Sequence, residues 1–456
     1  MRPAKLNSLP MLVLLGVTLL VSACSSPATR SYRRGVDAFE QSAPNAEVRP
    51  AEIDADASLD DLLRFAEWSN PGLRAAALRW RAALERVPQA TALPDPRLNF
   101  GYFLEEIETR TGPMDWRLGV SQSFPWPGTL DAAGSAEAAR AEAERARFES
   151  ERLALTEQVQ RTWFELAYVN AAHEVTRAHL DLLGRWEEVA RTRYATGLGN
   201  EADVIRAQVE LGKVNDRVRS LDDLRRPLGA RLNAALNRPA GAQLPTPALH
   251  VGGSALELDD ASLLADLAVT SPDLRALEHH IEAAEQGVAL ADKAYYPDLS
   301  LGLDYTAISS ARSPGVRGSG DDALAVTAGL SLPIWRGRRD AGARRANTLL
   351  AVARAEHDDL LNRQGAELEL ALYALRDASR RLSLYEDTLV PKGHESVQTT
   401  AVAYQSSKAS FLEFIDAERV LLEFQLAAAR ARADAAQALA RVERLSGVPL
   451  REESLP

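Results

Sequence analysis

The sequence predicts a mainly α-helical fold that also contains membrane-spanning β-strands, and three observations lead to this fold class. The chain is internally duplicated, and each half contains two segments in which apolar and polar residues alternate. Each half also contains a helical segment that is too long for the core of a globular domain.

The first residues predict a lipoprotein signal peptide at residues 1–23. Arg2 and Lys5 form a basic segment, and residues 11–21 form an apolar run that ends shortly before Cys24. The run is shorter than the roughly 18 apolar residues that a membrane-spanning helix needs. We therefore expect a cleaved secretion signal rather than a permanent transmembrane helix.

Cys24 is the only cysteine in the chain, so it cannot form an intramolecular disulfide. Its place directly after Val-Ser-Ala matches a bacterial lipobox and predicts lipidation, with a free buried thiol as the alternative. Several acyl chains on one residue give durable anchoring. Ser25, rather than Asp, at the next position favours the outer membrane by analogy with lipoprotein sorting. The polar segment 24–57 is expected to be an acylated tether.

Composition limits the class of partner. The chain has 456 residues, of which 46% are hydrophobic, and a formal net charge of -11. This length and composition allow a sizeable core. Because an acidic chain repels phosphate backbones, we expect no nucleic acid partner.

The two halves of the chain carry matching motifs in the same order. We therefore expect a first structural repeat at residues 58–250 and a second at 251–456, each with a helix, two strands, a long helix, a turn and a returning helix. The matching motifs are NPGLRA at Asn70 and SPDLRA at Ser271, PRLNFGY at Pro96 and PDLSLGL at Pro297, and FPWPGTLDA at Phe124 and LPIWRGRRDA at Leu332.

Strict alternation predicts two strands in each repeat, at 98–105 and 116–124 and at 299–305 and 324–332. One face of each strand is apolar and the other is small or polar. Each segment has about the length that a tilted membrane strand requires. Two ordinary hairpins on a soluble core are the alternative.

Four strands cannot close a membrane barrel, because the smallest known barrels use about eight strands and lipid does not tolerate an open sheet edge. If these strands span a membrane, the chain must therefore oligomerise. Three copies would supply twelve strands.

The helical segments predict coiled-coil packing. Residues 130–194 contain no proline and would form a helix roughly 100 Å long at 1.5 Å per residue. Apolar residues recur at intervals of seven, which indicates left-handed packing of neighbouring helices. These residues are Val175, Leu182 and Val189; Val214, Leu221 and Leu228; Leu361, Leu368, Leu375, Leu382 and Leu389; and Ala417, Phe424, Ala431, Ala438 and Leu445.

Two related turns reverse the chain between these helices. The first lies in RYATGLGNEADVIRAQ, which starts at Arg193, and the second in AYQSSKASFLEFIDAE, which starts at Ala403. Glycine gives backbone freedom, and Asn can cap the returning helix. We expect the tips of the hairpins at Gly197, Leu198, Gly199 and Asn200, and at Ser406, Ser407 and Lys408.

These motifs resemble the TolC-like family of bacterial outer membrane efflux proteins, in its acylated branch. The resemblance covers about residues 58–450 and is carried by the two turn motifs, the FPWPG junction and the lipobox. It implies a homotrimer with a trimeric α-barrel and a 12-stranded trimeric β-barrel. It also implies outer membrane lipid around the barrel, periplasmic turns, and two partners: a periplasmic adaptor, or membrane fusion protein, and an inner-membrane pump of the RND class.

The resemblance also implies a cargo class and a gate. Residues 94–113 look most like members associated with heavy-metal cation exporters. Glu413 and Asp416 occupy positions that form acidic pore rings in relatives, and their spacing of three places them on one helical face. Stacked carboxylate rings would attract cations. The alternative is that both are solvated carboxylates favoured by the helix dipole in the first turn.

Asp203 and Tyr404 match positions that hold neighbouring helices closed in relatives. The basic partner found there is missing in register, because Ala409 occupies its position and Lys408 lies beside it. The closing contacts are therefore expected to differ in this chain.

Three functions are compatible with the sequence: an exit duct, an enzyme on a lipid anchor, and a coiled-coil scaffold. No nucleophile elbow, phosphate loop or metal-ligand pair is present in the sequence, so we expect no catalytic residue, cofactor or metal site. A scaffold explains the helices but not the strands. We expect an outer membrane efflux duct for metal cations, with drug or organic-compound efflux as the alternative cargo.

Overall fold

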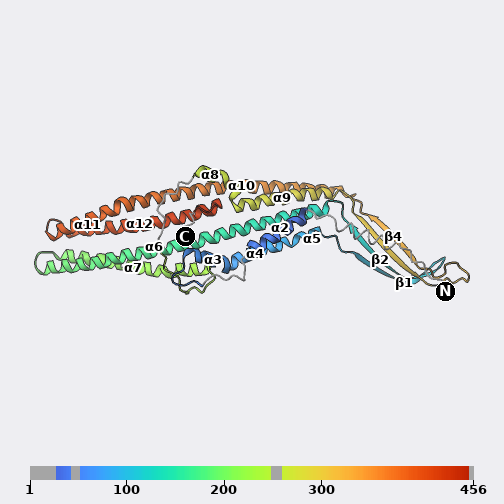
Figure 1. Ribbon diagram of the computed structural model, residues 1–456, viewed down its shortest axis with the longest axis horizontal. Helices are drawn as coiled ribbons and strands as arrows, with labels where there is room; N and C mark the ends of the chain where they lie inside the picture. The colour runs from blue at the N-terminus through green and yellow to red at the C-terminus, as the bar shows by residue number, and fades with distance from the viewer. Residues whose placement is uncertain (1–26, 43–51, 248–258, 451–456) are drawn as a thin grey trace. The chain divides into compact units, whose positions relative to one another are not determined.

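A computed structural model describes residues 27–42, 52–247 and 259–450 (Figure 1). The predicted signal peptide and the predicted lipidation site Cys24 lie outside these residues. The first half contains α2 (Pro27–Ser42), α3 (Leu59–Ser69), α4 (Pro71–Leu84), α5 (Arg86–Thr91), β1 (Arg97–Thr109), β2 (Gly112–Phe124), α6 (Thr129–Ala195) and α7 (Glu201–Ala235). The second contains α8 (Asp260–Thr270), α9 (Pro272–Lys293), β3 (Leu299–Ile308), β4 (Ala323–Leu330), α10 (Arg336–Leu384), η1 (Tyr385–Leu389), α11 (Val390–Gln405) and α12 (Phe411–Ser446).

The chain forms two compact units, and each repeat contributes to both. Unit 1 comprises residues 1–41, 79–145 and 276–357, which include all four strands. Unit 2 comprises residues 42–78, 146–275 and 358–456, which include both hairpin turns. None of the described helices combines the length and the apolar composition that a membrane-crossing helix requires.

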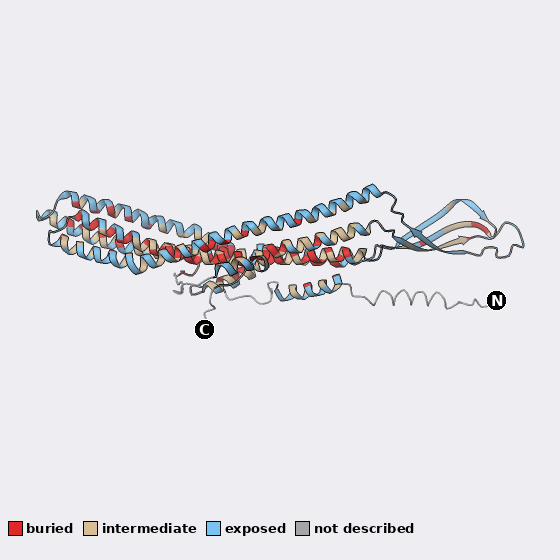
Figure 2. Cartoon of the chain, turned by 90° about the horizontal axis from the view of Figure 1, so that it is seen from above, coloured by how far each residue is buried: buried red, intermediate tan, exposed pale blue. Residues whose placement is uncertain are grey.

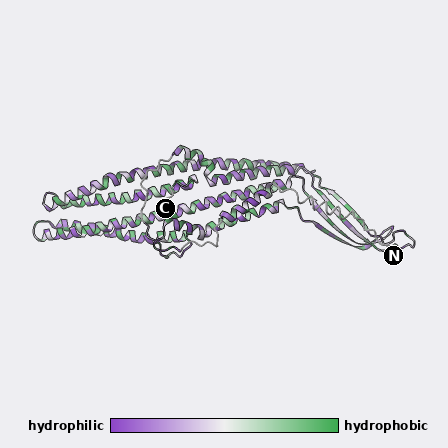
Figure 3. Ribbon diagram, in the orientation of Figure 1, coloured by the Kyte–Doolittle hydropathy of each residue, from purple (hydrophilic) through white to green (hydrophobic). Residues whose placement is uncertain are grey.

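The strands of unit 1 form one antiparallel sheet in the order β1-β2-β3-β4. All four predicted strands are confirmed, although β4 ends at Leu330, before the predicted end at residue 332. Alternation produces one apolar face, which is exposed in the chain: the exposed fraction is 68% for Leu98 and 81% for Val326. Figure 3 shows hydrophobic and hydrophilic residues interspersed along both the helices and the strands.

One hydrophobic cluster of unit 2 lies between the hairpin of α6 and α7 and the hairpin of α11 and α12 (Figures 1 and 2). A second cluster is formed by residues of α8, α9, α10 and α12. The predicted heptad stripe of α6 is displaced: Val189 is 37% exposed, whereas Leu183 and Ala190 are buried. The displacement arises because polar side chains also occupy the buried row. One of them, His179, lies with its Nδ1 3.3 Å from the Glu418 carboxylate of α12.

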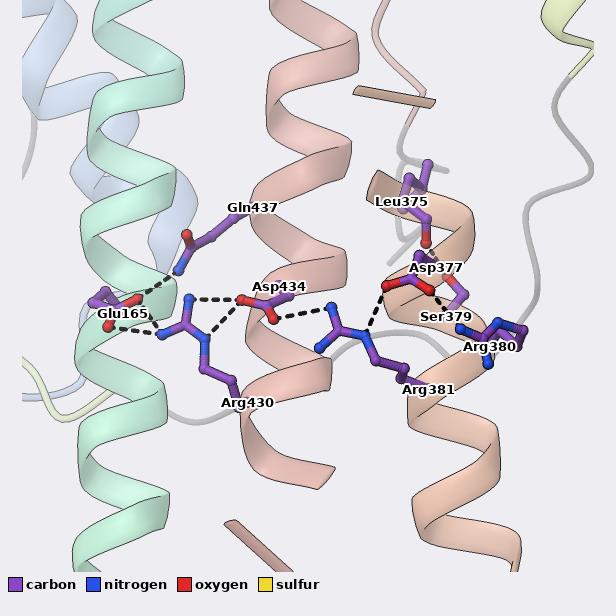
Figure 4. A network of polar contacts seen from close by, with 9 residues as sticks. All are labelled: Glu165, Leu375, Asp377, Ser379, Arg380, Arg381, Arg430, Asp434 and Gln437. Carbon is purple, nitrogen blue, oxygen red and sulfur yellow. Dashed lines mark hydrogen bonds and ion pairs between the residues drawn. The ribbon is translucent and has the colours of Figure 1, made fainter. Parts of the chain in front are cut away.

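Ion pairs also connect three helices of unit 2 (Figure 4). Arg430 of α12 donates both to Glu165 of α6, at 2.8 Å, and to Asp434, at 2.7 Å. Asp434 also accepts from Arg381 of α10 at 3.3 Å. The guanidinium of Arg430 lies 4.9 Å from the Tyr168 ring centre. This chain of contacts fixes the rotation of α12 relative to its neighbours.

The second long helix differs from the expected continuous helix. Its α-helical hydrogen bonding is interrupted by the π-helical turn η1, in which the Val390 N–H donates to the Tyr385 carbonyl. Pro391 explains the interruption, because proline lacks an N–H and its ring crowds the carbonyl four residues earlier. Glu386 within η1 forms an ion pair with Arg432 of α12.

Part of the predicted tether is ordered and helical. α2 packs within unit 1: the Phe39 ring lies edge-to-face with Trp80 at 5.2 Å between ring centres. Gly35 is buried against Leu84, and the Tyr32 hydroxyl donates to Glu85 at 3.3 Å. The helix was not predicted from the sequence, because residues 24–57 are polar overall and only one face of the helix is apolar.

Candidate functional site

The two predicted turns have the same backbone geometry. The N–H groups of Leu198 and Gly199 donate to the Arg193 carbonyl, at 2.8 and 3.0 Å. In the second turn, the N–H groups of Lys408 and Ala409 donate to the Ala403 carbonyl, at 2.7 and 3.2 Å. Gly197 (φ 73°) and Ser407 (φ 59°) both have left-handed backbones at matching positions. Ser407 therefore carries a strain that glycine avoids in the first turn.

Each returning helix begins with a side-chain cap. Asn200 accepts a hydrogen bond from the Asp203 N–H at 3.0 Å, as its predicted capping role requires. Ser410 and Glu413 form a reciprocal capping box: Ser410 Oγ accepts from the Glu413 N–H, and the Ser410 N–H donates to the Glu413 carboxylate at 2.6 Å. The two hydrogen bonds from Ser410 lower the pKa of Glu413.

The predicted gate residues are both exposed in the chain and both have local partners. Asp416 accepts from Arg419 at 3.1 Å, and Arg419 also contacts Glu210 of α7. Glu413 is engaged in the capping box. Glu413 lies in the first turn of α12, as the alternative expected, whereas Asp416 lies beyond that turn. A ring of carboxylates around a pore axis stays a prediction.

The two predicted closing residues lie near each other. Tyr404 is 4% exposed and packs against the rings of Trp186, Phe411 and Phe414. Burial raises the pKa of Tyr404, and the charge of Asp203 raises it further. Within the described residues, the Tyr404 hydroxyl has no hydrogen-bond partner.

Arg193 links the two turns and was missed by reasoning from the sequence. Its guanidinium lies 5.0 Å from the Tyr404 ring centre and donates to the Ser407 hydroxyl at 2.9 Å. It also donates to the carbonyls of Gln405 and Leu198, each at 3.3 Å. The corresponding residue of the second repeat is Ala403, so comparing the repeats gave no signal for this role.

A metal centre has no support in the described part of the chain, where no cluster of three or more His, Cys, Asp or Glu side chains could hold an ion. The candidate functional features of the described residues are the exposed apolar face of the sheet and the two helical turns that Arg193 links.

This architecture matches that of solved outer membrane channels. The chain aligns with the outer membrane protein VceC from Vibrio cholerae over 88% of its own length and 100% of that chain, with a TM-score of 0.71 and 22% identity. CusC gives a TM-score of 0.73 at 17% identity, covering 88% of this chain and 98% of that chain. The expected fold class is thus confirmed at the level of the single chain.

The chain belongs to the outer membrane efflux protein family, whose model matches residues 62–238 and 263–448. It is 23% identical to the pyoverdine export outer membrane protein OpmQ of Pseudomonas putida, over 94% of this chain and 95% of that protein. It is 27% identical to the solvent efflux pump outer membrane protein SrpC of Pseudomonas putida, over 60% of this chain and 58% of that protein. It is therefore an outer membrane channel component of an efflux system, from a family of transport proteins.

Proposed function

We propose that three copies of the chain form one outer membrane exit duct. The carrying observation is the sheet: within the described residues, β1 and β4 each pair with a neighbour on one side only. An open edge exposes unpaired N–H and C=O groups, which lipid cannot satisfy. Pairing β4 of one copy with β1 of the next removes every edge and gives twelve strands.

The apolar face supplies the membrane contact in this proposal. Its exposed apolar side chains come from all four strands. Large exposed apolar patches mark sites of interaction with a membrane or a partner. Lipid would cover this face, and Cys24 acylation would add an anchor. The residues are Leu98, Phe100, Tyr102, Leu118, Val120, Leu299, Leu301, Leu303, Leu324, Val326 and Leu330.

The hairpin turns are the proposed docking point for a periplasmic adaptor, which would connect the duct to an inner-membrane pump of the RND class. Leu198 at the first turn is 71% exposed, an apolar side chain available for a protein contact. Arg193 would hold the two turns of one chain together for this contact. The resemblance to TolC-like proteins supports both partners.

The proposed cargo is a class of organic compounds. This choice rests on the relatives, whose names record export of pyoverdine and efflux of solvents. The first expectation, metal cations, rests on the likeness of residues 94–113 to metal-exporter components and is kept as the second candidate. These residues span β1 and its turn rather than a set of metal ligands.

Single-channel recording in a planar bilayer tests the duct. The purified mature protein is expected to give stepwise currents of constant size. A barrel with no free strand edge encloses a water-filled pore, and such a pore conducts ions. A lipid-anchored enzyme or a coiled-coil scaffold would give none. Absence of steps from correctly folded, detergent-solubilised protein would contradict the proposal.

Growth of a deletion strain separates the two cargoes. Loss of the gene is expected to lower tolerance of toluene and siderophore-like compounds, and expression of the intact chain is expected to restore it. Lowered tolerance of Cu²⁺, Zn²⁺ or Ag⁺ alone would instead support the metal-cation candidate.

A further inference from the structure

The end of the sheet at which the strands join the helices carries a cluster of arginines. The cluster lies in residues 335–345, which follow β4 and open α10, and this segment contains one acidic residue, Asp340. The corresponding segment of the first repeat, residues 125–139, contains no lysine or arginine. The cluster is therefore not needed to join a strand to a long helix. Its members are Arg336, Arg338, Arg339, Arg344 and Arg345.

Four of these five arginines have guanidinium groups that are free to bind a ligand. Arg339 is the exception, because it donates to the carbonyls of Ala294, at 2.6 Å, and Trp335, at 3.2 Å. Asp340 already accepts from the Tyr295 hydroxyl at 2.6 Å. Within the described residues, none of the other four guanidinium groups makes a hydrogen bond or an ion pair, and all four residues are exposed.

The acidic residues of the neighbouring junctions do not cancel this positive charge. Asp298 holds two other junctions close, because its carbonyl accepts from the Ser331 N–H at 3.0 Å and its carboxylate accepts from the Trp126 N–H at 3.1 Å. The helix end of the sheet therefore stays positive, with a formal charge of +2 in a chain whose net charge is -11. That count covers seven positive and five negative side chains in residues 92–97, 124–131, 292–298 and 331–345.

The opposite end of the sheet is acidic. Residues 103–115 and 307–322 contain six negative and three positive side chains, which give a formal charge of -3. Arg312 at this end pairs with Glu106 and Glu108. An excess of positive charge is thus found at the helix end of the sheet and not at the far end.

The arginine cluster directly continues the exposed apolar face. The exposed fraction is 68% for Leu332, 66% for Ile334 and 75% for Trp335. Tryptophan is enriched where a membrane meets water. Arg336 and Arg338 follow Trp335 by one and three residues, so they lie within a few ångströms of that boundary along α10.

The placement of these arginines is unfavourable for the helix alone. The first turn of α10 contains no acidic residue and begins with Arg336. Positive side chains at a helix N-terminus oppose the helix dipole, whereas a bound anion there is stabilised by both. An anionic partner at this position would offset that cost.

We propose that Arg336 and Arg338 bind the phosphates of anionic phospholipids in the leaflet that meets the helix end of the sheet. The inference rests on the proposed duct, in which the apolar face contacts lipid. Arginine forms paired hydrogen bonds with phosphate, and basic side chains beside a membrane attract anionic lipids. Arg344 and Arg345 begin about 12 Å further along α10 and add a weaker, longer-range attraction.

Tryptophan quenching by brominated lipids tests the inference with the mature protein in bilayers. Quenching by brominated phosphatidylcholine reports contact between the apolar face and lipid. The ratio of the association constants of phosphatidylglycerol and phosphatidylcholine reports the arginines. We expect phosphatidylglycerol to bind roughly tenfold more strongly to the unchanged protein, and R336Q/R338Q to bring this ratio close to one.

The control R217Q/R219Q removes two exposed arginines of α7 with the same spacing, and it should keep the tenfold ratio. R336K/R338K keeps the charge and should retain most of the preference. Inorganic phosphate at constant ionic strength should not lower the ratio, because the ligand is a lipid at the bilayer surface.

Each other outcome counts against the inference. A ratio near one in the unchanged protein, or an unchanged ratio in R336Q/R338Q, would overturn it. Loss of the preference in millimolar phosphate would show that the site binds free phosphate instead. Absence of quenching by brominated phosphatidylcholine would contradict the membrane contact of the duct itself, which is a different failure.

Discussion

At the scale of single residues, Glu413 has a structural role that is separable from its predicted role in a gate. Its carboxylate caps α12 through Ser410, a role that glutamine can also fill. The pair E413Q/D416N therefore removes two charges while retaining the cap. If the gate prediction is correct, this variant should raise conductance roughly twofold and weaken cation binding at the turns.

The control for this prediction is E413A. Alanine removes the capping contact and should lower the free energy of unfolding by about 1 kcal/mol. Normal conductance and normal ion preference in E413Q/D416N would contradict the gate and leave capping as the role of Glu413.

The lowered pKa of Glu210 predicts that the stability of unit 2 depends on pH. The hydrogen bond from Arg419 lowers the pKa of Glu210, although burial opposes the shift, and Lys213 adds to it. A carboxyl whose pKa is lower in the folded state stabilises the fold above its unfolded pKa, about 4.3 for Glu. That stabilisation is lost as the pH falls through this value toward the folded pKa.

Thermal unfolding of the native protein and of E210Q checks this dependence. The native protein should be the more stable at pH 7, and the difference should shrink as the pH falls below about 4.3. A difference that stays constant between pH 7 and pH 3 would show that Glu210 contributes by packing alone.

At the scale of elements, the packing of α2 depends on the close approach of Gly35 to Leu84. A Cβ at Gly35 would lie 2.4 Å from Leu84 Cδ2. G35V should therefore displace α2 at a cost of about 1–3 kcal/mol. Limited proteolysis should detect faster cleavage of residues 27–42 in G35V than in R34A, which changes an exposed neighbour. Equal cleavage rates would show that α2 does not depend on this contact.

The strands could be predicted from the sequence because their period of two is strict in all four segments. The pairing of β2 with β3 joins the two repeats. It could not be predicted from the sequence, because the alternation within a strand does not specify which other strand it pairs with. The displaced stripe of α6 was missed for another reason: Val189 is apolar but exposed, whereas His179 and Glu187 are polar but buried. A count of apolar residues cannot recognise such buried polar side chains, which are held by Glu418 in the case of His179 and by Arg191 and Gln208 in the case of Glu187.

The candidate site was predictable only in part. The N-cap role of Asn200 could be predicted from its residue type and its position before the returning helix. Arg193 does not, because its contacts with Tyr404 and Ser407 bridge two distant segments of the chain. The π-helical turn follows from Pro391, but whether a proline ends or only distorts a helix depends on packing around it.

At the scale of the whole molecule, a trimeric barrel requires that the free edges of β1 and β4 meet between copies. Asn99 of β1 and Ala325 of β4 lie on the polar face of these edge strands and are exposed. A chain carrying both N99C and A325C can be cross-linked only where β1 and β4 come close. The single variants N99C and A325C provide the matched controls.

Cross-linking of the double variant in outer membranes with a short bifunctional maleimide is the most direct measurement. For a trimeric barrel we expect a ladder of bands that ends at three chains, and no ladder from either single variant. A product that stays at one chain, or a ladder that ends at another number, would contradict the trimeric barrel.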